Sequence, residues 1–545
     1  MARRPQVREF VDWSGGLNYV GDAFTLAENQ VVDCLNVRLL PRGGFERRKT
    51  AVATHEEPFT DARNMWAYNG VEPPQIIVQD GDSIQVTDDL LTFAEYTPAS
   101  GSTSGVMRAA TLARQVTTTD AARGDERCYV QRNADAQAFR WNGTSIALMT
   151  DAYGAWNENL EAPSGGKMPK AKFICAHQGF LFHANIYENS KQMVNRVRFS
   201  HPSEPEDYRQ DDWFDVGGDG EPITGIVSFG PTLYIFKNSS VWAFSGYSAD
   251  TFQLMRMSDL LGAPGQDAIV AAPNGLYFFD AHDGVYVIGS DGQIRWLWDN
   301  MSTLITDGQI PGTYVSKVSL AWMDQRLWVS VPWLDTNINK RVFVFDPLLG
   351  QGGGWYQYAY GNGDSAYGFG FSAMLEFRPA AGEICYLALG SGGEYLYRAE
   401  YDGGRYDVRG GNVNVRFSSW LQTAWYRVGM AGAKKRFRRP RFVLDASEDS
   451  TVRVTAYRDF DREGQKKSMN LSVSGIFDGG EWDSFLWDDA VWGSSSKSDQ
   501  TIVRGQSLGS GYAVSLLFQG QSDSAGSRRW GVNAVDLIFL PRAVR

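Results

Sequence analysis

The chain has 545 residues, with 52 Lys and Arg against 63 Asp and Glu, a formal net charge of -11, and only 5 His and 4 Cys. This length exceeds one ordinary domain and suits several units or one large repeat architecture. A hydrophobic content of 43% and a charged content of 21% exclude wholesale disorder. The 58 Gly and the 13% aromatic content favour an all-β protein with many tight turns and exclude a long coiled coil.

Residues 1–55 are expected to form an N-terminal arm. Thr25-Leu-Ala-Glu28 has the form of a capping box before an apolar stretch, so the sequence predicts a short helix at about 26–36. The basic run Arg47-Arg48-Lys49 follows. No stretch approaches the ~20 apolar residues of a membrane span, and the first ten residues lack the apolar run of a signal peptide. We therefore expect a protein made in a cytoplasm.

Residues 56–410 carry a repeating hairpin pattern. Within 267–298, four short β-prone runs are separated by Asn-Gly and Asp-Gly turns, which is typical of an antiparallel meander. A meander that recurs every ~45–55 residues is the pattern of propeller blades. We expect a β-propeller of six to eight four-stranded blades, seven being the best fit, with stacked sandwiches as the structural alternative. The hairpins are anchored on Ile76, Tyr129, Leu181, Leu233, Leu276, Leu327 and Tyr386.

Residues 411–545 alternate in strand fashion with longer loops and predict a C-terminal β-sandwich-like domain, or strands that return to close the propeller. A basic run begins at Lys434 and ends at Arg441. It favours docking to an acidic patch on a neighbouring subunit, contact with nucleic acid, or a solvated strand face. A later loop mixes tryptophans with acidic residues and predicts either an interface anchor or a small satellite core. The docking residues expected here are Lys434, Lys435, Arg436, Arg438, Trp482 and Trp487.

No pattern in the sequence predicts catalysis. The five histidines form no H-E-x-x-H motif, no phosphate-binding or dinucleotide-binding glycine motif is present, and the four cysteines lack metal-ligand spacing. We therefore expect no enzyme, no cofactor and no metal site. An acidic stretch at 204–221 is expected to be a solvated loop, with a calcium site or a negative surface that faces a lumen or a basic partner as alternatives.

The opening Phe10-Val-Asp-Trp-Ser-Gly-Gly-Leu-Asn18, together with Asp33–Val37 and Gly44–Arg48, resembles the start of bacteriophage tail nozzle proteins. These are the tail tubular protein B and packaged-DNA-stabilisation families of short-tailed phages. The stretch from about 195 to 250 is similar to their central region. The resemblance implies a β-propeller protein that assembles as a homo-oligomeric ring, usually sixfold, below the portal and its adaptor ring.

On this basis we expect a virion structural protein of the tail, assembled in the host cytoplasm. It would form the distal channel for genome retention and ejection, with fibres or a needle attached nearby and double-stranded DNA passing without specific binding. A net charge of -11 suits such passage, because a basic lumen would hold the phosphate backbone. Docking to the adaptor is expected through Trp13, Leu17, Arg47 and Arg48, with charge reversal at the two arginines blocking assembly without unfolding the monomer.

Two other functions compete with this one. The chain could be a glycan- or receptor-binding tail protein in which exposed tryptophans stack on sugars. It could also be a tail-borne glycan depolymerase, which needs two facing carboxylates. A cellular propeller scaffold is the remaining alternative.

Overall fold

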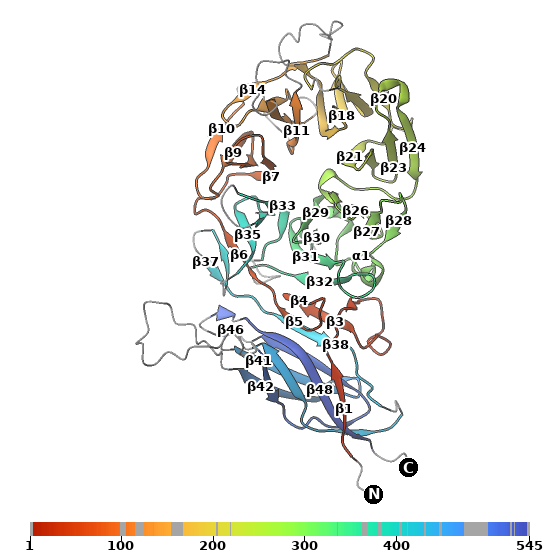
Figure 1. Cartoon of the computed structure of the whole chain (residues 1–545), viewed down its shortest axis with the longest axis vertical. Coiled ribbons are helices and arrows are strands. Elements are labelled where there is room, and N and C mark those ends of the chain that lie inside the picture. The colour runs from red at the N-terminus through yellow and green to blue at the C-terminus, as the bar shows by residue number, and fades with distance from the viewer. Residues whose placement is uncertain are drawn as a thin grey trace, which may run out of the picture.

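The computed structural model contains a β-propeller joined to a β-sandwich (Figure 1). No helix among the described residues is long and apolar enough to cross a membrane. The structure describes the whole chain except residues 1–3, 99–104, 115–124, 134–135, 154–166, 203–204, 219, 335, 362–367, 380–383, 403–405, 411–412, 430–431, 446–449, 474–499, 521, 524–525, 528 and 542–545.

Seven four-stranded antiparallel units follow one another along the described chain, and we number them blades 1 to 7. Blade 1 consists of β7 (Ala62–Tyr68), β8 (Gln75–Asp80), β9 (Ser83–Thr87) and β10 (Ala94–Tyr96). Blade 2 consists of β11 (Arg108–Arg114), β12 (Asp125–Gln131), β13 (Phe139–Trp141) and β14 (Ile146–Leu148). Blade 3 consists of β17 (Lys170–His177), β18 (Phe180–Glu188), β19 (Lys191–Phe199) and β20 (Trp213–Asp215). A short parallel pair, β15 (Thr150–Asp151) and β16 (Lys167–Met168), lies between blades 2 and 3.

The other four blades continue the same order. Blade 4 consists of β21 (Ile223–Phe229), β22 (Thr232–Lys237), β23 (Val241–Ser245) and β24 (Gln253–Ser258). Blade 5 consists of β25 (Ile269–Ala272), β26 (Gly275–Asp280), β27 (Gly284–Ile288) and β28 (Ile294–Trp296). Blade 6 consists of β29 (Ser319–Met323), β30 (Arg326–Pro332), β31 (Asn339–Asp346) and β32 (Gly354–Tyr358). Blade 7 consists of β33 (Phe371–Phe377), β34 (Cys385–Gly390), β35 (Leu396–Tyr401) and the N-terminal strand β6 (Thr50–Ala53), and β36 (Asp407–Arg409) and β37 (Val413–Val415) extend its sheet.

The blades close into a ring. The first strand of each blade contacts the first strand of the next, and β33 of blade 7 contacts β7 of blade 1. Strand β6 pairs with β35, so a strand from the start of the chain completes the last blade. The predicted propeller and its repeat are confirmed. All seven anchor residues lie in the second strand of their blade, and these strands read as apolar runs because both of their faces are buried, as in β26 and β30.

Two sheets form the sandwich. One contains β1 (Gln6–Phe10), β4 (Val37–Leu39), β5 (Phe45–Arg47), β39 (Lys435–Phe437), β40 (Arg441–Asp445), β43 (Gln500–Arg504), β44 (Gly509–Gly511) and β48 (Gly531–Pro541). The other contains β2 (Gly16–Leu17), β3 (Gln30–Leu35), β38 (Trp420–Thr423), β45 (Val514–Gly520), β41 (Ser450–Arg458) and β42 (Asp461–Val473). A separate small pair joins β46 (Ser522–Asp523) to β47 (Gly526–Ser527).

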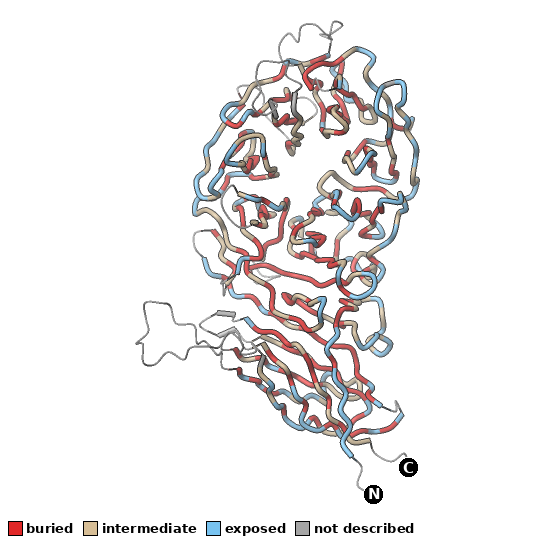
Figure 2. Tube along the Cα trace, viewed as in Figure 1, coloured by how far each residue is buried: buried red, intermediate tan, exposed pale blue. Residues whose placement is uncertain are grey.

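Residues 1–55 do not form a separate arm. Strand β1 pairs with β48, β3 pairs with β38, and β6 joins blade 7, so this segment holds sandwich and propeller together. One hydrophobic core runs without interruption from Trp298 near blade 5, through Tyr358 of blade 6, to Phe518 of the sandwich. Buried chain accordingly continues across the joint (Figure 2).

The helix expected at 26–36 is wrong. The segment forms turns and then strand β3, in which Val31, Cys34 and Leu35 are buried. The ladder of β3 is completed by β38, almost 390 residues further along the chain, and such a distant partner overrides the local capping signal. Among the described residues the only α-helix is α1 (Thr303–Thr306), and the 3₁₀ turns are η1 (Ala249–Thr251), η2 (Gln266–Ala268), η3 (Asp299–Met301) and η4 (Gly312–Lys317).

Candidate functional site

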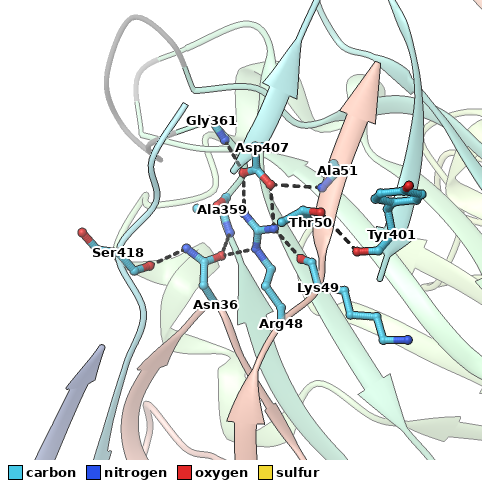
Figure 3. Close-up of polar contacts among 10 residues, drawn as sticks. All are labelled: Asn36, Arg48, Lys49, Thr50, Ala51, Ala359, Gly361, Tyr401, Asp407 and Ser418. Atoms are coloured by element: carbon cyan, nitrogen blue, oxygen red, sulfur yellow. Dashed lines mark hydrogen bonds and ion pairs between the residues drawn. The ribbon is translucent and has the colours of Figure 1, made fainter. Parts of the chain in front are cut away.

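Arg48 is at the centre of the joint between propeller and sandwich (Figure 3). Its Nη1 and Nη2 donate to the two carboxylate oxygens of Asp407 at 2.9 and 2.6 Å, and both side chains are fully buried. Nε donates to Asn36 Oδ1 at 2.8 Å, and the backbone oxygens of Lys49 and Ala359 accept the other two N–H groups. All five donors of the guanidinium are therefore used. Burial alone would lower the pKa of Arg48, but Asp407 outweighs it and raises that pKa above its ordinary value.

Asn36 fixes the geometry around Arg48. Its backbone is in the left-handed region (φ 56°), which Asn tolerates better than most residues. Its side chain donates to Ser418 O at 2.7 Å and accepts from Ala359 N at 2.8 Å. Asn36 thus links the N-terminal segment both to the chain directly after β32 of blade 6 and to the chain just before β38 of the sandwich.

The four N-terminal residues expected to dock an adaptor are buried inside the chain. Trp13 and Leu17 are fully buried, and Trp13 Nε1 donates to Tyr426 Oη at 3.0 Å. Arg47 is 5% exposed and its guanidinium lies 4.6 Å from the centre of the Phe417 ring. The docking assignment is therefore corrected, because buried side chains cannot contact an adaptor. A charge change at Arg48 would break a buried ion pair and destabilise the fold.

An ion pair crosses the axial opening of the propeller. Arg108, at the start of β11 in blade 2, binds both carboxylate oxygens of Asp267 in η2, which precedes blade 5. Blades 2 and 5 are not neighbours in the ring, so the pair spans the axis. Both side chains are more than half buried, with exposures of 14% and 32%. The pair links blades 2 and 5, which are not neighbours in the ring.

An arginine-rich groove lies on the outer face of the sandwich sheet that contains β1 and β48. The groove has a volume of about 450 Å³, and we call it the arginine groove. In β39 the residues alternate, so Lys435 and Phe437 are buried while Arg436 is exposed. The alternation of a strand therefore sends only part of the basic run to this face. The groove is lined by Pro5, Arg436, Arg438, Arg439, Arg441, Arg504, Ser507 and Ile538.

The five arginines of the groove have no ion-pair partner in the part of the chain that the structure describes. Arg441 lies opposite Arg504 on one side and Asp536 on the other in the strand register. Among the described residues no carboxylate lies within ion-pair distance of any of the five. A cluster of unpaired guanidinium groups can bind carboxylates or phosphates through paired hydrogen bonds.

The docking residues predicted near the C-terminus lie in three different environments. Arg436 and Arg438 line the arginine groove, and Lys434 is exposed beside it. Lys435 is buried, and its Nζ donates to Tyr512 O at 3.1 Å, so this residue is corrected to a core position. Burial lowers the pKa of Lys435, with Asp459 opposing that effect. Trp482 and Trp487 lie outside the described residues.

The acidic stretch at 204–221 is partly a structural element. Glu206 is buried and accepts from Arg127 at 2.8 Å and from Arg140 at 2.6 Å. Burial opposes ionisation of Glu206, but the two arginines together lower its pKa. Within the described chain, no group of three or more His, Cys, Asp or Glu residues has the arrangement of a metal site.

His183 is held in a buried hydrogen-bond chain. Gln131 Nε2 lies 3.0 Å from His183 Nδ1 and also donates to Pro169 O. Because an amide nitrogen only donates, Nδ1 must accept, and the ring proton is on Nε2, which lies 2.7 Å from Tyr208 Oη. Burial lowers the pKa of His183 to about 3. The group is a satisfied structural histidine.

No family model and no curated protein matches the chain. Among solved structures it is similar to BBS1N in a complex with ARL6DN, at 11% identity and a TM-score of 0.42 over 66% of this chain and 98% of that one. Virginiamycin B lyase from Staphylococcus aureus matches at 11% identity and a TM-score of 0.37 over 62% and 95%. YCF48 bound to D1 peptide matches at 10% identity and a TM-score of 0.36 over 65% and 95%. These are propeller neighbours of varied function, and they bear on the fold only.

Proposed function

We propose that the chain is a structural protein of a bacteriophage tail, a nozzle or hub subunit without enzymatic activity. The observation that carries the proposal is where the phage-like residues lie. The opening motif, the Asn36 segment and the Gly44–Arg48 segment together build the joint of propeller and sandwich through Trp13, Asn36 and Arg48. The residues that resemble tail nozzle proteins are therefore those that fix the propeller relative to the sandwich. A tail subunit that keeps its shape during genome ejection would need such a rigid joint.

In this proposal the chain forms a homo-oligomeric ring, with sixfold symmetry expected, below a portal adaptor and beside fibres or a needle. The genome passes between the copies and not along the propeller axis. The Arg108–Asp267 pair supports this assignment because it joins two non-neighbouring blades across the propeller axis. The surface around the passing DNA would then come from the acidic chain as a whole, which does not retain phosphates.

The test is the mass of the purified full chain in solution together with electron-microscope class averages. A closed ring with an axial opening wide enough for duplex DNA is the expected result, either alone or on addition of the adaptor. A chain that stays monomeric under both conditions contradicts the proposal.

A second candidate function is glycan or receptor binding. Three aromatic side chains at the outer edges of blades 3 to 5 favour it: Trp213, Tyr247 and Trp296 are 39%, 77% and 44% exposed. Arg196 covers one face of Trp213 at 3.7 Å, which leaves one face for a sugar. Quenching of tryptophan fluorescence by host cell-wall fragments, lost in Trp296→Ala, would support this function over the first, and release of reducing sugar would indicate a depolymerase.

A further inference from the structure

The arginine groove has two chemically different sides. In the antiparallel register Arg436 lies opposite Leu540, and Ile538 lies opposite Val7 of β1. Residues directly opposite each other point to the same face of a sheet, so the arginines share this face with an apolar strip formed by Val7, Ile538 and Leu540. Val7 is 58% exposed, although it is a valine in a strand. An occupant that fits both sides must combine negative charges with apolar groups.

One stretch of the same chain has this composition. Residues 474–499 lie outside the described residues, and their sequence contains six carboxylates and one lysine. The carboxylates alternate with three tryptophans, as in Glu481-Trp482-Asp483 and Trp487-Asp488-Asp489. The net charge of this stretch therefore matches the five unpaired arginines in number and opposes them in sign.

We propose that the arginine groove docks the acidic, tryptophan-bearing stretch 474–499 of a second copy of this chain. Carboxylates of the stretch bind the guanidinium groups of Arg438, Arg439 and Arg441, and its tryptophans cover the strip of Val7 and Ile538 or stack on the arginines. The contact joins two different surfaces of identical chains, and such a head-to-tail contact repeats from copy to copy and closes into a ring where the rotation allows.

A nucleic-acid backbone fits the groove less well. A phosphodiester backbone has no apolar groups that could cover the exposed apolar strip. The protein as a whole has a net charge of -11, which repels a polyanion. The sheet also places Glu9 opposite Asp536, so carboxylates close one end of the face beside Arg441. A nucleic-acid backbone carries a charge at every nucleotide and would have to pass these carboxylates, whereas the stretch 474–499 contains uncharged runs, at 484–487 and 490–496, that are not repelled by them.

The docking contact would be a contact between neighbouring copies in the proposed ring, and its biological role rests on the proposed function. Its test is a binding measurement that needs no ring. The full chain is titrated into a labelled synthetic peptide of residues 474–499, and binding is followed by fluorescence anisotropy at low and moderate salt. In that chain the six carboxylates of its own 474–499 stretch are replaced by amides, so that the stretch cannot compete with the peptide. The six changes are Asp478→Asn, Glu481→Gln, Asp483→Asn, Asp488→Asn, Asp489→Asn and Asp499→Asn.

We expect saturable binding that Arg438→Glu together with Arg441→Glu weakens by about tenfold or more. Arg453→Glu is the matched control, since Arg453 is an exposed arginine on β41 in the other sheet of the sandwich, and it should leave binding unchanged. An unchanged circular dichroism spectrum and an unchanged thermal unfolding midpoint of the double variant exclude misfolding as the cause of the loss.

Binding that is equal in the groove variant and the control overturns the inference. It is also overturned if a short DNA duplex binds through the groove arginines while the peptide does not. Peptide binding in a chain that never forms rings leaves the docking contact standing and contradicts the proposed function. Rings that form normally with a reversed groove contradict the docking contact and leave the proposed function intact.

Discussion

Arg48 and the arginine groove place the same residue type in opposite environments. Arg48 is fully buried with all five donors used, while Arg438 and Arg441 are exposed and have no ion-pair partner among the described residues. A buried charge is tolerated only when it is fully paired, so Arg48 has no capacity left for a partner. The exposed arginines keep all of theirs. Basic runs that look alike in sequence therefore have different roles: one stabilises the fold, and the other is open to a partner.

The largest expected effect is at the joint. Asp407→Asn or Arg48→Lys leaves a buried charge or its hydrogen bonds uncompensated, and we expect a loss of about 3–5 kcal/mol in the free energy of unfolding. Urea titration followed by near-UV circular dichroism measures it. Arg409→Ala is the control, because its ion pair with Glu394 is partly exposed, at 34% and 51%, and should contribute less than about 1 kcal/mol. Similar losses in the two variants would remove the contrast between buried and exposed arginines.

A smaller effect is expected from pH at His183. Burial lowers its folded pKa to about 3, while the unfolded chain binds this proton below its ordinary pKa of 6.5. Stability is therefore complete above pH 6.5 and falls as the pH is lowered, by about 2 kcal/mol between pH 6.5 and 5 from this group alone. His183→Gln should flatten the slope of unfolding free energy against pH. His282→Gln is the control, since that side chain is 91% exposed, and an equal change in slope would refute the assignment.

An intermediate case between buried and exposed charge is the Arg108–Asp267 pair. Its partial burial should give a coupling energy of about 1 kcal/mol in a double-mutant cycle of Arg108→Ala and Asp267→Ala. Hydrogen exchange should also increase in β11 and β25, the strands next to the two residues. Strictly additive losses would mean that the pair does not tie the two blades together.

The smallest effect on stability is expected in the arginine groove. Arg438→Glu together with Arg441→Glu should change the free energy of unfolding by no more than about 0.5 kcal/mol, because both side chains are exposed and no described carboxylate pairs with them. Thermal unfolding of the full chain measures it. A loss of several kcal/mol would place these arginines in the same structural class as Arg48 and would remove the groove as a docking site.

Local patterns in the sequence determined most of the propeller. The turns at Asn274-Gly275 and Asp283-Gly284 and the apolar runs between them predict blade 5, because a hairpin depends only on residues near one another. The recurring buried second strands then predict the repeat. The basic run 434–441 predicts part of the groove. The strand alternation that buries Lys435 and exposes Arg436 then decides which of its residues reach that face.

Tertiary structure alone decided the role of the N-terminal segment. Residues 26–36 carry a helix signal, and Arg47 and Arg48 look like a surface patch, yet β3, β5 and β6 are strands whose partners lie hundreds of residues away. Burial of Arg48 depends on Asp407, which no local pattern connects to it. Sequence shows what a residue can form with its neighbours along the chain. Which distant groups surround it in the folded state decides whether a charged side chain stabilises the core or remains available for a partner.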